Sequence, residues 1–310
     1  KSIQTIGLNR AVYQGFSTND EFSGDTALGK SVGKAVAVEN MEDHIFVWIF
    51  FKNKIKIGFL KKYLRLFFQK FKQTLNLLPM IAFFKKLLQR FNPTPTPEFI
   101  AQQLRKPQGV FAKTIGERMN ESNRSLYRLV LQHLELHPGD QVLEIGFGNG
   151  HFFKEVLHKA EKLKLYGIDY SAAMVKAARK NNADLIRQGL LDLQMGSSDQ
   201  LPYAAGLFDA VFCINVIYFW DKPFAHLQEI GRVMKPGARF YVGIRTKEIM
   251  EKLPFVTPLF NLRGVEEIQH IFAECGFELI HTQEENEPPV TLYGATYDMQ
   301  GMCLVFEKKA

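Results

Sequence analysis

The stretch Val142-Leu143-Glu144-Ile145-Gly146-Phe147-Gly148-Asn149-Gly150 joins a short apolar run to three glycines at alternate positions. A strand that ends in a glycine-rich turn lets a ligand approach the backbone closely, because no Cβ stands in the way. A dinucleotide-binding turn reads G-x-G-x-x-G, and its third glycine would fall on the position of His151. The spacing therefore predicts a ligand-binding turn and argues against a dinucleotide as the ligand.

The composition is that of an ordinary globular protein, with 46% hydrophobic and 23% charged residues among 310. The cysteines are three in number, Cys213, Cys275 and Cys303, and no C-x-x-C pair or histidine pair at ligand spacing accompanies them. This usage favours a reducing compartment and predicts neither a metal site nor a disulfide framework. The first forty residues are polar and show no signal peptide. We therefore expect a cytoplasmic protein.

The net charge of +7 is concentrated in one segment. Residues 52–92 hold eleven Lys or Arg residues and no acidic residue, which leaves 28 basic against 32 acidic residues elsewhere. The basic character therefore belongs to this segment and not to the rest of the chain.

Residues 1–40 are rich in Gly, Ser, Thr and Asn, and we expect them to be disordered. They contain Gly24-Asp25-Thr26-Ala27-Leu28-Gly29-Lys30-Ser31, which fits the phosphate-loop pattern G-x-x-x-x-G-K-[ST]. That pattern binds phosphate only where a buried strand leads into it and a helix follows. The polar residues 17–21 before it are no strand, so we reject this site.

Residues 41–97 are expected to form a basic amphipathic helical segment followed by a proline-rich linker at 92–97. The apolar run 45–51 is too short for a bilayer span of about 20 residues. From Phe59 to Phe91, Leu and Phe recur at helical spacing with lysines opposite. Three interpretations stay open: peripheral membrane contact through 41–91, a hairpin packed on the following domain, or sequence outside the working protein. Nucleic acid is not expected as a partner, because Phe and Leu dominate the segment.

From residue 98 to 310 strand-like and helix-like patterns alternate, which predicts an α/β domain with a mainly parallel sheet covered on both faces. The strands are expected at 141–145, 163–168, 190–195, 210–214, 239–244, 277–282 and 302–306, and the helices at about 121–136, 149–160, 171–182, 222–234 and 265–274.

The pattern E-x-G-x-G-x-G, with Asp169 nineteen residues past Gly150, resembles the S-adenosylmethionine (SAM) turn of class I SAM-dependent methyltransferases. The segments 195–203, 213–220 and 229–237 are similar to later motifs of that family, in the same order. The resemblance spans about 105–310. It implies a Rossmann-like three-layer sandwich with a seven-stranded sheet, a SAM cofactor and a methyltransferase activity.

The resemblance also implies a set of cofactor contacts. Asp169 ends a strand, where it would bind ribose hydroxyls, although Asp also caps helices well. Ser197 stands where the family has an acid that reads adenine, and Asp199 is a substitute for that acid. The full set of expected cofactor-binding residues is Glu144, Gly146, Gly148, Gly150, Asp169, Tyr170, Met174, Ser197, Ser198 and Asn215.

Methyl transfer from a sulfonium needs alignment and desolvation, and a base only where the acceptor must lose a proton. The sequence supplies two candidates for such a base, Tyr218 and His151. The aromatic run Tyr218-Phe219-Trp220 fits a small-molecule or lipid-like acceptor. Two alternatives to a methyltransferase stay open: a non-catalytic SAM-binding protein and a dinucleotide-dependent oxidoreductase.

Overall fold

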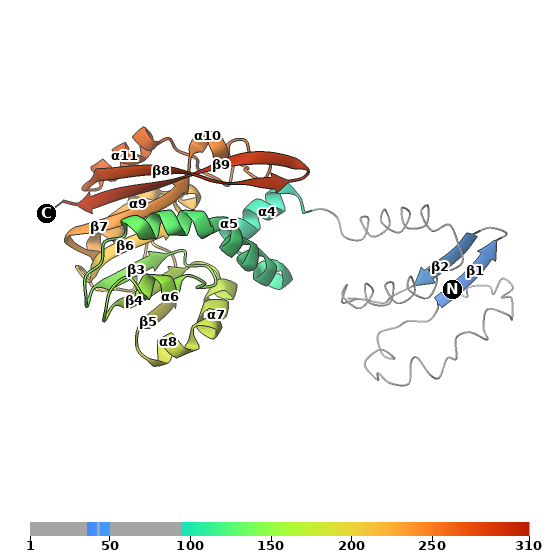
Figure 1. Ribbon diagram of the computed structural model, residues 1–310, viewed down its shortest axis with the longest axis horizontal. Coiled ribbons are helices and arrows are strands. Elements are labelled where there is room, and N and C mark those ends of the chain that lie inside the picture. The colour runs from blue at the N-terminus through green and yellow to red at the C-terminus, as the bar shows by residue number, and fades with distance from the viewer. Residues whose placement is uncertain (1–35, 42–43, 50–94, 310) are drawn as a thin grey trace. The chain divides into compact units, whose positions relative to one another are not determined.

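The structure is a computed structural model that describes residues 36–41, 44–49 and 95–309. The chain divides into two compact units, Lys1–Pro93 and Thr94–Ala310 (Figure 1). Within the first unit, β1 (Val36–Met41) and β2 (His44–Ile49) pair antiparallel, with Met41 opposite His44.

This hairpin differs from the expectation of disorder up to residue 40 and a helix beyond it. The segments 36–38 and 45–49 are rich in Val, Ile, Phe and Trp, which favour strands, and only two residues separate the paired ends. The helical stripes between 59 and 91 and the phosphate-loop pattern at 24–31 lie outside the described residues.

The second unit contains a seven-stranded sheet in the order β5-β4-β3-β6-β7-β9-β8. The first five strands in this order run parallel, and β9 is antiparallel to both β7 and β8. This arrangement confirms the predicted Rossmann-like α/β class with a mainly parallel sheet. The strands are β3 (Gln141–Ile145), β4 (Lys164–Asp169), β5 (Leu191–Met195), β6 (Phe208–Ile214), β7 (Met234–Arg245), β8 (Phe277–Leu292) and β9 (Ala295–Lys308).

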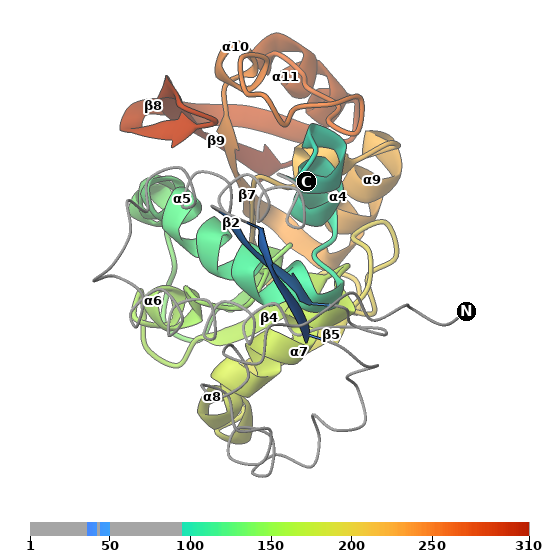
Figure 2. The ribbon, with the colours of Figure 1, turned by 90° about the vertical axis from the view of Figure 1, so that its right-hand side faces the viewer.

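The helices of this unit cover both faces of the sheet, and Figure 2 shows α5 and α6 on one side and α9 and α11 on the other. Two short 3₁₀ turns are also present: η1 (Gly109–Phe111) directly precedes α5, and η2 (Ile217–Phe219) precedes α9. The helices are α4 (Pro97–Arg105), α5 (Ala112–His133), α6 (Phe153–Leu157), α7 (Ala172–Asn181), α8 (Ala183–Arg187), α9 (Pro223–Val233), α10 (Lys247–Met250) and α11 (Val265–Glu274).

The core divides into two clusters because successive strand residues point to opposite faces of the sheet. In β3, Leu143 and Ile145 pack with the side chains of α9 and α11, whereas Val142 packs with α5, α6 and α7. Glu144 shares the face of Val142 and is 1% exposed. A carboxyl group is therefore buried against α5, where it needs a hydrogen-bond partner.

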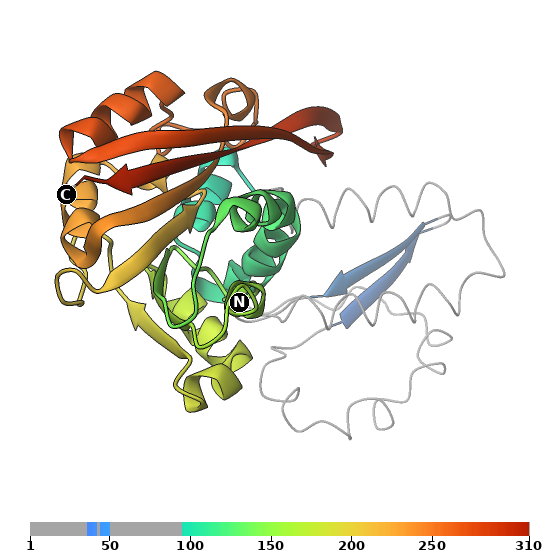
Figure 3. The same cartoon turned by 60° about the vertical axis from the view of Figure 1, so that its left-hand side comes forward.

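All seven predicted strands of the sheet are present, but α4, β8 and β9 differ from the sequence-based expectation. The helix α4 occupies the end of the expected linker: Pro97 is in its first turn, and the Thr96 side chain accepts the Phe99 N–H at 3.2 Å. The strands β8 and β9 are longer than expected and form a hairpin that extends past their neighbours (Figure 3).

Within the part of the chain that the structure describes, no helix is both long and apolar enough to cross a bilayer. The same residues contain no group of three or more His, Cys, Asp or Glu side chains arranged to hold a metal ion.

Candidate functional site

A cavity of about 530 Å³ lies at the carboxyl ends of β3, β4, β5 and β6. This is the edge of an open parallel sheet at which α/β proteins bind ligands. The glycine turn after β3 forms one wall, and residues from α4 and α5 form the opposite one. The cavity therefore lies where the sequence places the ligand.

The three glycines of the turn all have positive φ angles, of 74° at Gly146, 59° at Gly148 and 68° at Gly150. A Cβ at Gly146 would overlap Val216 Cγ2, and a Cβ at Gly150 would overlap the Phe153 ring. A Cβ at Gly148 would meet no atom within 4 Å. Two glycines are thus required by packing inside the protein, while Gly148 leaves open space against the backbone.

Asp169 ties the glycine turn to the start of α7. Its Oδ2 accepts the Gly148 N–H at 2.8 Å, and its Oδ1 accepts the Ser171 N–H at 2.8 Å. Burial raises the pKa of this carboxyl to about 6, although the two backbone hydrogen bonds act in the opposite direction. Each carboxylate oxygen accepts a second hydrogen bond readily, so the ribose and helix-start interpretations of Asp169 are compatible.

Glu144 lies behind the turn and does not line the cavity. Its carboxyl group accepts the hydroxyl of Tyr127, whose ring stacks on Phe152 at a centroid distance of 3.9 Å. Burial raises the pKa of Glu144 to about 8. Tyr127 and Phe152 both line the cavity, so Glu144 acts on its wall through Tyr127 rather than by direct contact.

Asn149 supplies an unpaired polar atom to the cavity. Its Oδ1 is buried and accepts no hydrogen bond from the described residues. Met174 is 2% exposed and also lines the cavity, and the Cβ of a side chain at Gly116 would come within 3.3 Å of both residues. Tyr170 lines the rim, is 55% exposed and lies under the Lys106 ammonium group at 3.9 Å.

The loop after β5 brings Ser197, Ser198 and Asp199 to the cavity. The Gly196 N–H donates to the Asp169 carbonyl at 3.1 Å, which fixes this loop beside the end of β4. The Ser198 hydroxyl is 2.8 Å from Nδ1 of His226, a residue of α9 that the sequence did not single out.

Asn215 follows β6 with a φ of 57° and lines the cavity. Its amide donates to Asn123 Oδ1 of α5 at 3.0 Å. Arg245, at the end of β7, donates to the Ser122 carbonyl at 2.6 Å and forms a bidentate pair with Glu287 at 2.8 and 2.9 Å. A buried polar network therefore joins α5, β6, β7 and β8 beside the cavity.

Neither candidate base lies in the cavity. The Tyr218 hydroxyl donates to the Arg245 carbonyl at 2.8 Å, because η2 turns this side chain back toward β7. Burial raises the pKa of Tyr218 well above its ordinary value. His151 is exposed, lies 3.3 Å from Arg124 Nη2 and packs edge-on against Phe152. The structure thus brings neither side chain to the cavity wall, and a catalytic role for either stays a prediction from the sequence.

The cavity is closed on one side by α4. Arg105 Nη2 lies 2.6 Å from Asp221 Oδ2, and both residues line the cavity. The hydrogen bond from Arg105 lowers the pKa of Asp221. The sequence singled out none of Arg105, Tyr127, Asn123 and His226 as a residue of the cavity wall.

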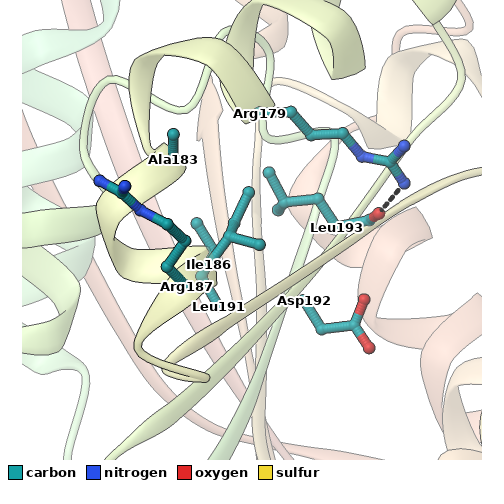
Figure 4. Close-up of a pocket in the computed structure, with 7 residues that line it drawn as sticks. All are labelled: Arg179, Ala183, Ile186, Arg187, Leu191, Asp192 and Leu193. Atoms are coloured by element: carbon teal, nitrogen blue, oxygen red, sulfur yellow. Dashed lines mark hydrogen bonds between the residues drawn. The ribbon is translucent and has the colours of Figure 1, made fainter.

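A second hollow of about 470 Å³ lies under α8 (Figure 4). Its walls are mainly Ile186, Leu191 and Leu193, and Arg179 donates to the Leu193 carbonyl at 2.5 Å. It shares no residue with the cavity at the glycine turn. Arg179, Arg187 and Asp192 also line it, but it has neither a glycine turn nor a buried carboxylate, so the cavity at the glycine turn is the better candidate site.

Comparisons with known proteins agree with this architecture. A family model described as a methyltransferase domain matches residues 143–242. The methyltransferase YdaC of Bacillus subtilis is 30% identical over 175 residues, which cover 56% of this chain and 91% of YdaC. Cycloartenol-C-24-methyltransferase 1 of Oryza sativa is 24% identical, with 57% of this chain and 55% of the plant protein covered.

A methyltransferase solved with the Haloferax volcanii Trm112 methyltransferase activator has the same fold, with a TM-score of 0.56 at 17% identity. The match covers 64% of this chain and 96% of that protein. Sheet order and glycine turn together define a class I methyltransferase fold. With the similarity to YdaC added, the chain belongs to the class I SAM-dependent methyltransferases.

Proposed function

We propose that this protein binds SAM in the cavity at the glycine turn and transfers its methyl group to a small-molecule or lipid-like acceptor. The observation that carries the proposal is the geometry around Gly148. Its Cα faces open space, its N–H is held by Asp169, and the Asp169 carboxylate lines the same cavity.

The residues present fit a cofactor of this chemistry. The buried Asn149 Oδ1 lacks a donor among the described residues, and an ammonium or hydroxyl group would supply one. The space at Gly148 would be filled by any other side chain. A carboxylate, an unpaired amide oxygen and an open backbone turn are together suited to a ligand that carries hydroxyl and ammonium donors.

Several residues would hold the cofactor in this proposal. Asp169 would accept hydrogen bonds from the ribose hydroxyls. The methionine part of the cofactor would lie along Gly146 and Gly148. Met174 and Ser198 would contact the adenine ring. When bound, SAM supplies a methyl group on a positively charged sulfur. The protein's own part is to orient the acceptor and exclude water from the methyl group.

The cavity walls support a flat or lipid-like acceptor. The apolar side chains of Leu104, Met119, Val216 and Phe219 line it together with the Trp220 ring. Asn120 and Asn123 add amide groups that would fix the orientation of a polar end. The similarity to a sterol methyltransferase agrees with an apolar acceptor of this kind.

A labelling experiment tests the proposed activity. The full chain is incubated with methyl-labelled SAM and a cell extract, which is then separated into lipid and aqueous fractions. We expect label in a low-molecular-weight acceptor, with Asp169→Asn as the variant that loses it. If SAM binds but no fraction is labelled, the protein is a non-catalytic SAM-binding protein and the proposed transfer is wrong.

Peripheral membrane contact through 41–91 stays a prediction from the sequence. Flotation with vesicles that contain anionic lipid, compared between the full chain and a chain lacking 41–91, measures it. Loss of flotation on deletion supports the contact, and equal flotation of both proteins removes it.

A further inference from the structure

The loop after β5 has Ser197 where the family resemblance leads one to expect an acidic residue that contacts adenine, and Asp199 lines the cavity two residues further on. Between these two residues, Ser198 forms a hydrogen bond with a histidine. Ser198 Oγ lies 2.8 Å from His226 Nδ1, and both residues line the cavity.

We propose that Ser198 and His226 act as one unit that recognises the 6-amino group of the cofactor's adenine. His226 fixes the direction of the Ser198 hydroxyl, and the Ser198 oxygen accepts the amino group. The inference rests on the proposed function, since it concerns the binding of SAM in the same cavity.

The pair is held rigidly by its surroundings. The His226 ring stacks on the Trp220 ring at a centroid distance of 4.8 Å and an angle of 6°. Ser198 is 5% exposed, and its loop is bound to the end of β4 through the Gly196 N–H. A group in such a position has one available hydrogen-bonding geometry, which is the condition for selectivity.

The donors and acceptors of Ser198 and His226 determine which ligand group the pair can bind. A neutral histidine has one nitrogen that donates and one that accepts. Where Nδ1 of His226 accepts, the Ser198 hydroxyl donates to it, and the remaining lone pairs of the serine oxygen are free to accept. Ser198 Oγ has no other hydrogen-bond partner among residues 95–309. An exocyclic amino group suits this arrangement, whereas a 6-oxo group would place two acceptors together.

Charged side chains surround the His226 ring. Asp199 in the loop after β5 and Asp221 after η2 both act on the ring, and Lys222 at the start of α9 also lines the cavity. The proposal requires the tautomer with its proton on Nε2, in which Nδ1 accepts the Ser198 hydroxyl. Burial lowers the pKa of His226, although the two carboxylates oppose this effect. The neutral form therefore prevails at neutral pH.

Protonation of His226 would reverse the direction of the hydrogen bond between His226 and Ser198. Both ring nitrogens would then donate, the Ser198 hydroxyl hydrogen would turn toward the cavity, and the amino group would meet a donor. The selectivity of the protein for adenine over its 6-oxo counterpart should therefore decrease as the pH is lowered. The ratio of the affinities for an adenine ligand and for its 6-oxo analogue does not depend on the protonation of Asp169, because both ligands carry the same ribose.

The test is calorimetric titration of the full chain with S-adenosylhomocysteine and with S-inosylhomocysteine, its 6-oxo analogue, at pH 7.5 and 5.5. We expect wild type to prefer the adenine ligand at least about fivefold at the higher pH, and less at the lower. Ser198→Ala and His226→Phe should abolish the preference. His226→Asn, whose amide oxygen takes the acceptor role, should keep it at both pH values, and the exposed His158→Phe is the matched control.

The outcomes separate the two proposals. If wild type binds neither ligand, the proposed function fails. If wild type binds both but Ser198→Ala and His226→Phe leave the ratio unchanged, this inference alone fails. The inference would also be overturned if Asp199→Asn removed the preference for the adenine ligand while Ser198→Ala and His226→Phe did not. A nitrogen NMR spectrum that shows a proton on Nδ1 of His226 in the neutral wild type would contradict it without any variant.

Discussion

Replacement of Gly148 by alanine separates the effect of backbone strain from the effect of lost ligand space. The added Cβ would meet no protein atom within 4 Å, so the folded state pays only for a non-glycine residue at a φ of 59°. That conformation costs about 1–2 kcal/mol for an L-residue. In a domain of this size, 1 kcal/mol corresponds to about 2–4 °C in melting temperature. We therefore expect Gly148→Ala to lower the melting temperature by about 2–8 °C.

Gly206 offers a matched control for this substitution. It has a φ of 62°, a Cβ there would also meet nothing within 4 Å, and it lies outside the cavity. Gly206→Ala should carry the same loss of stability and bind S-adenosylhomocysteine like wild type. Gly148→Ala should bind it at least about tenfold more weakly, which is 1.4 kcal/mol. Thermal melting and calorimetry measure both quantities. Equal ligand affinity in the two variants would refute the assignment of the space at Gly148 to the cofactor.

Three further predictions follow from buried charges. The affinity for S-adenosylhomocysteine should be constant above pH about 6 and fall below it. Burial raises the pKa of Asp169 to about 6, and protonation of its carboxylate removes a hydrogen-bond acceptor. A calorimetric affinity that stays constant down to pH 5 would contradict this. Burial raises the pKa of Glu144 from 4.5 to about 8, so its contribution to the free energy of unfolding is complete below pH 4.5 and is lost as the pH rises through 8, by at most about 1.4 kcal/mol per pH unit. Glu144→Gln should flatten this dependence in urea titrations, and superimposable curves would show the reasoning to be wrong. Arg245→Ala leaves Glu287, 5% exposed in its side chain, without its partner, and should cost about 3–5 kcal/mol in the free energy of unfolding; a loss below about 1 kcal/mol would rule out a structural role for the pair.

The fold and the glycine turn could be predicted because their signals are local. The apolar run 142–145, the turn glycines and Asp169 follow one another along the chain, and each reports on its own strand or turn. Successive strand residues point to opposite faces of the sheet, so the place of a strand in the chain also predicts which of its residues share a face.

The polar partners of the site could not be predicted, because they come from distant elements. Tyr127 and Glu144 are 17 residues apart, Ser198 and His226 are 28 apart, and Asn123 and Asn215 are 92 apart. Nothing in the local sequence pairs them.

Tyr218 illustrates a second limit of the sequence. It does follow β6 at the edge of the cavity, but η2 directs its hydroxyl to the Arg245 backbone. Sequence position predicted the location of this residue and not the direction of its side chain.

The central claim is that the cavity at the glycine turn binds SAM, and parallel calorimetric titrations of the full chain with SAM and with NAD test it most directly. We expect saturable one-to-one binding of SAM, no heat from NAD, and loss of SAM binding in Asp169→Ala with the folded structure retained. Binding of NAD in preference to SAM, or SAM binding that is unchanged in Asp169→Ala, would contradict the account.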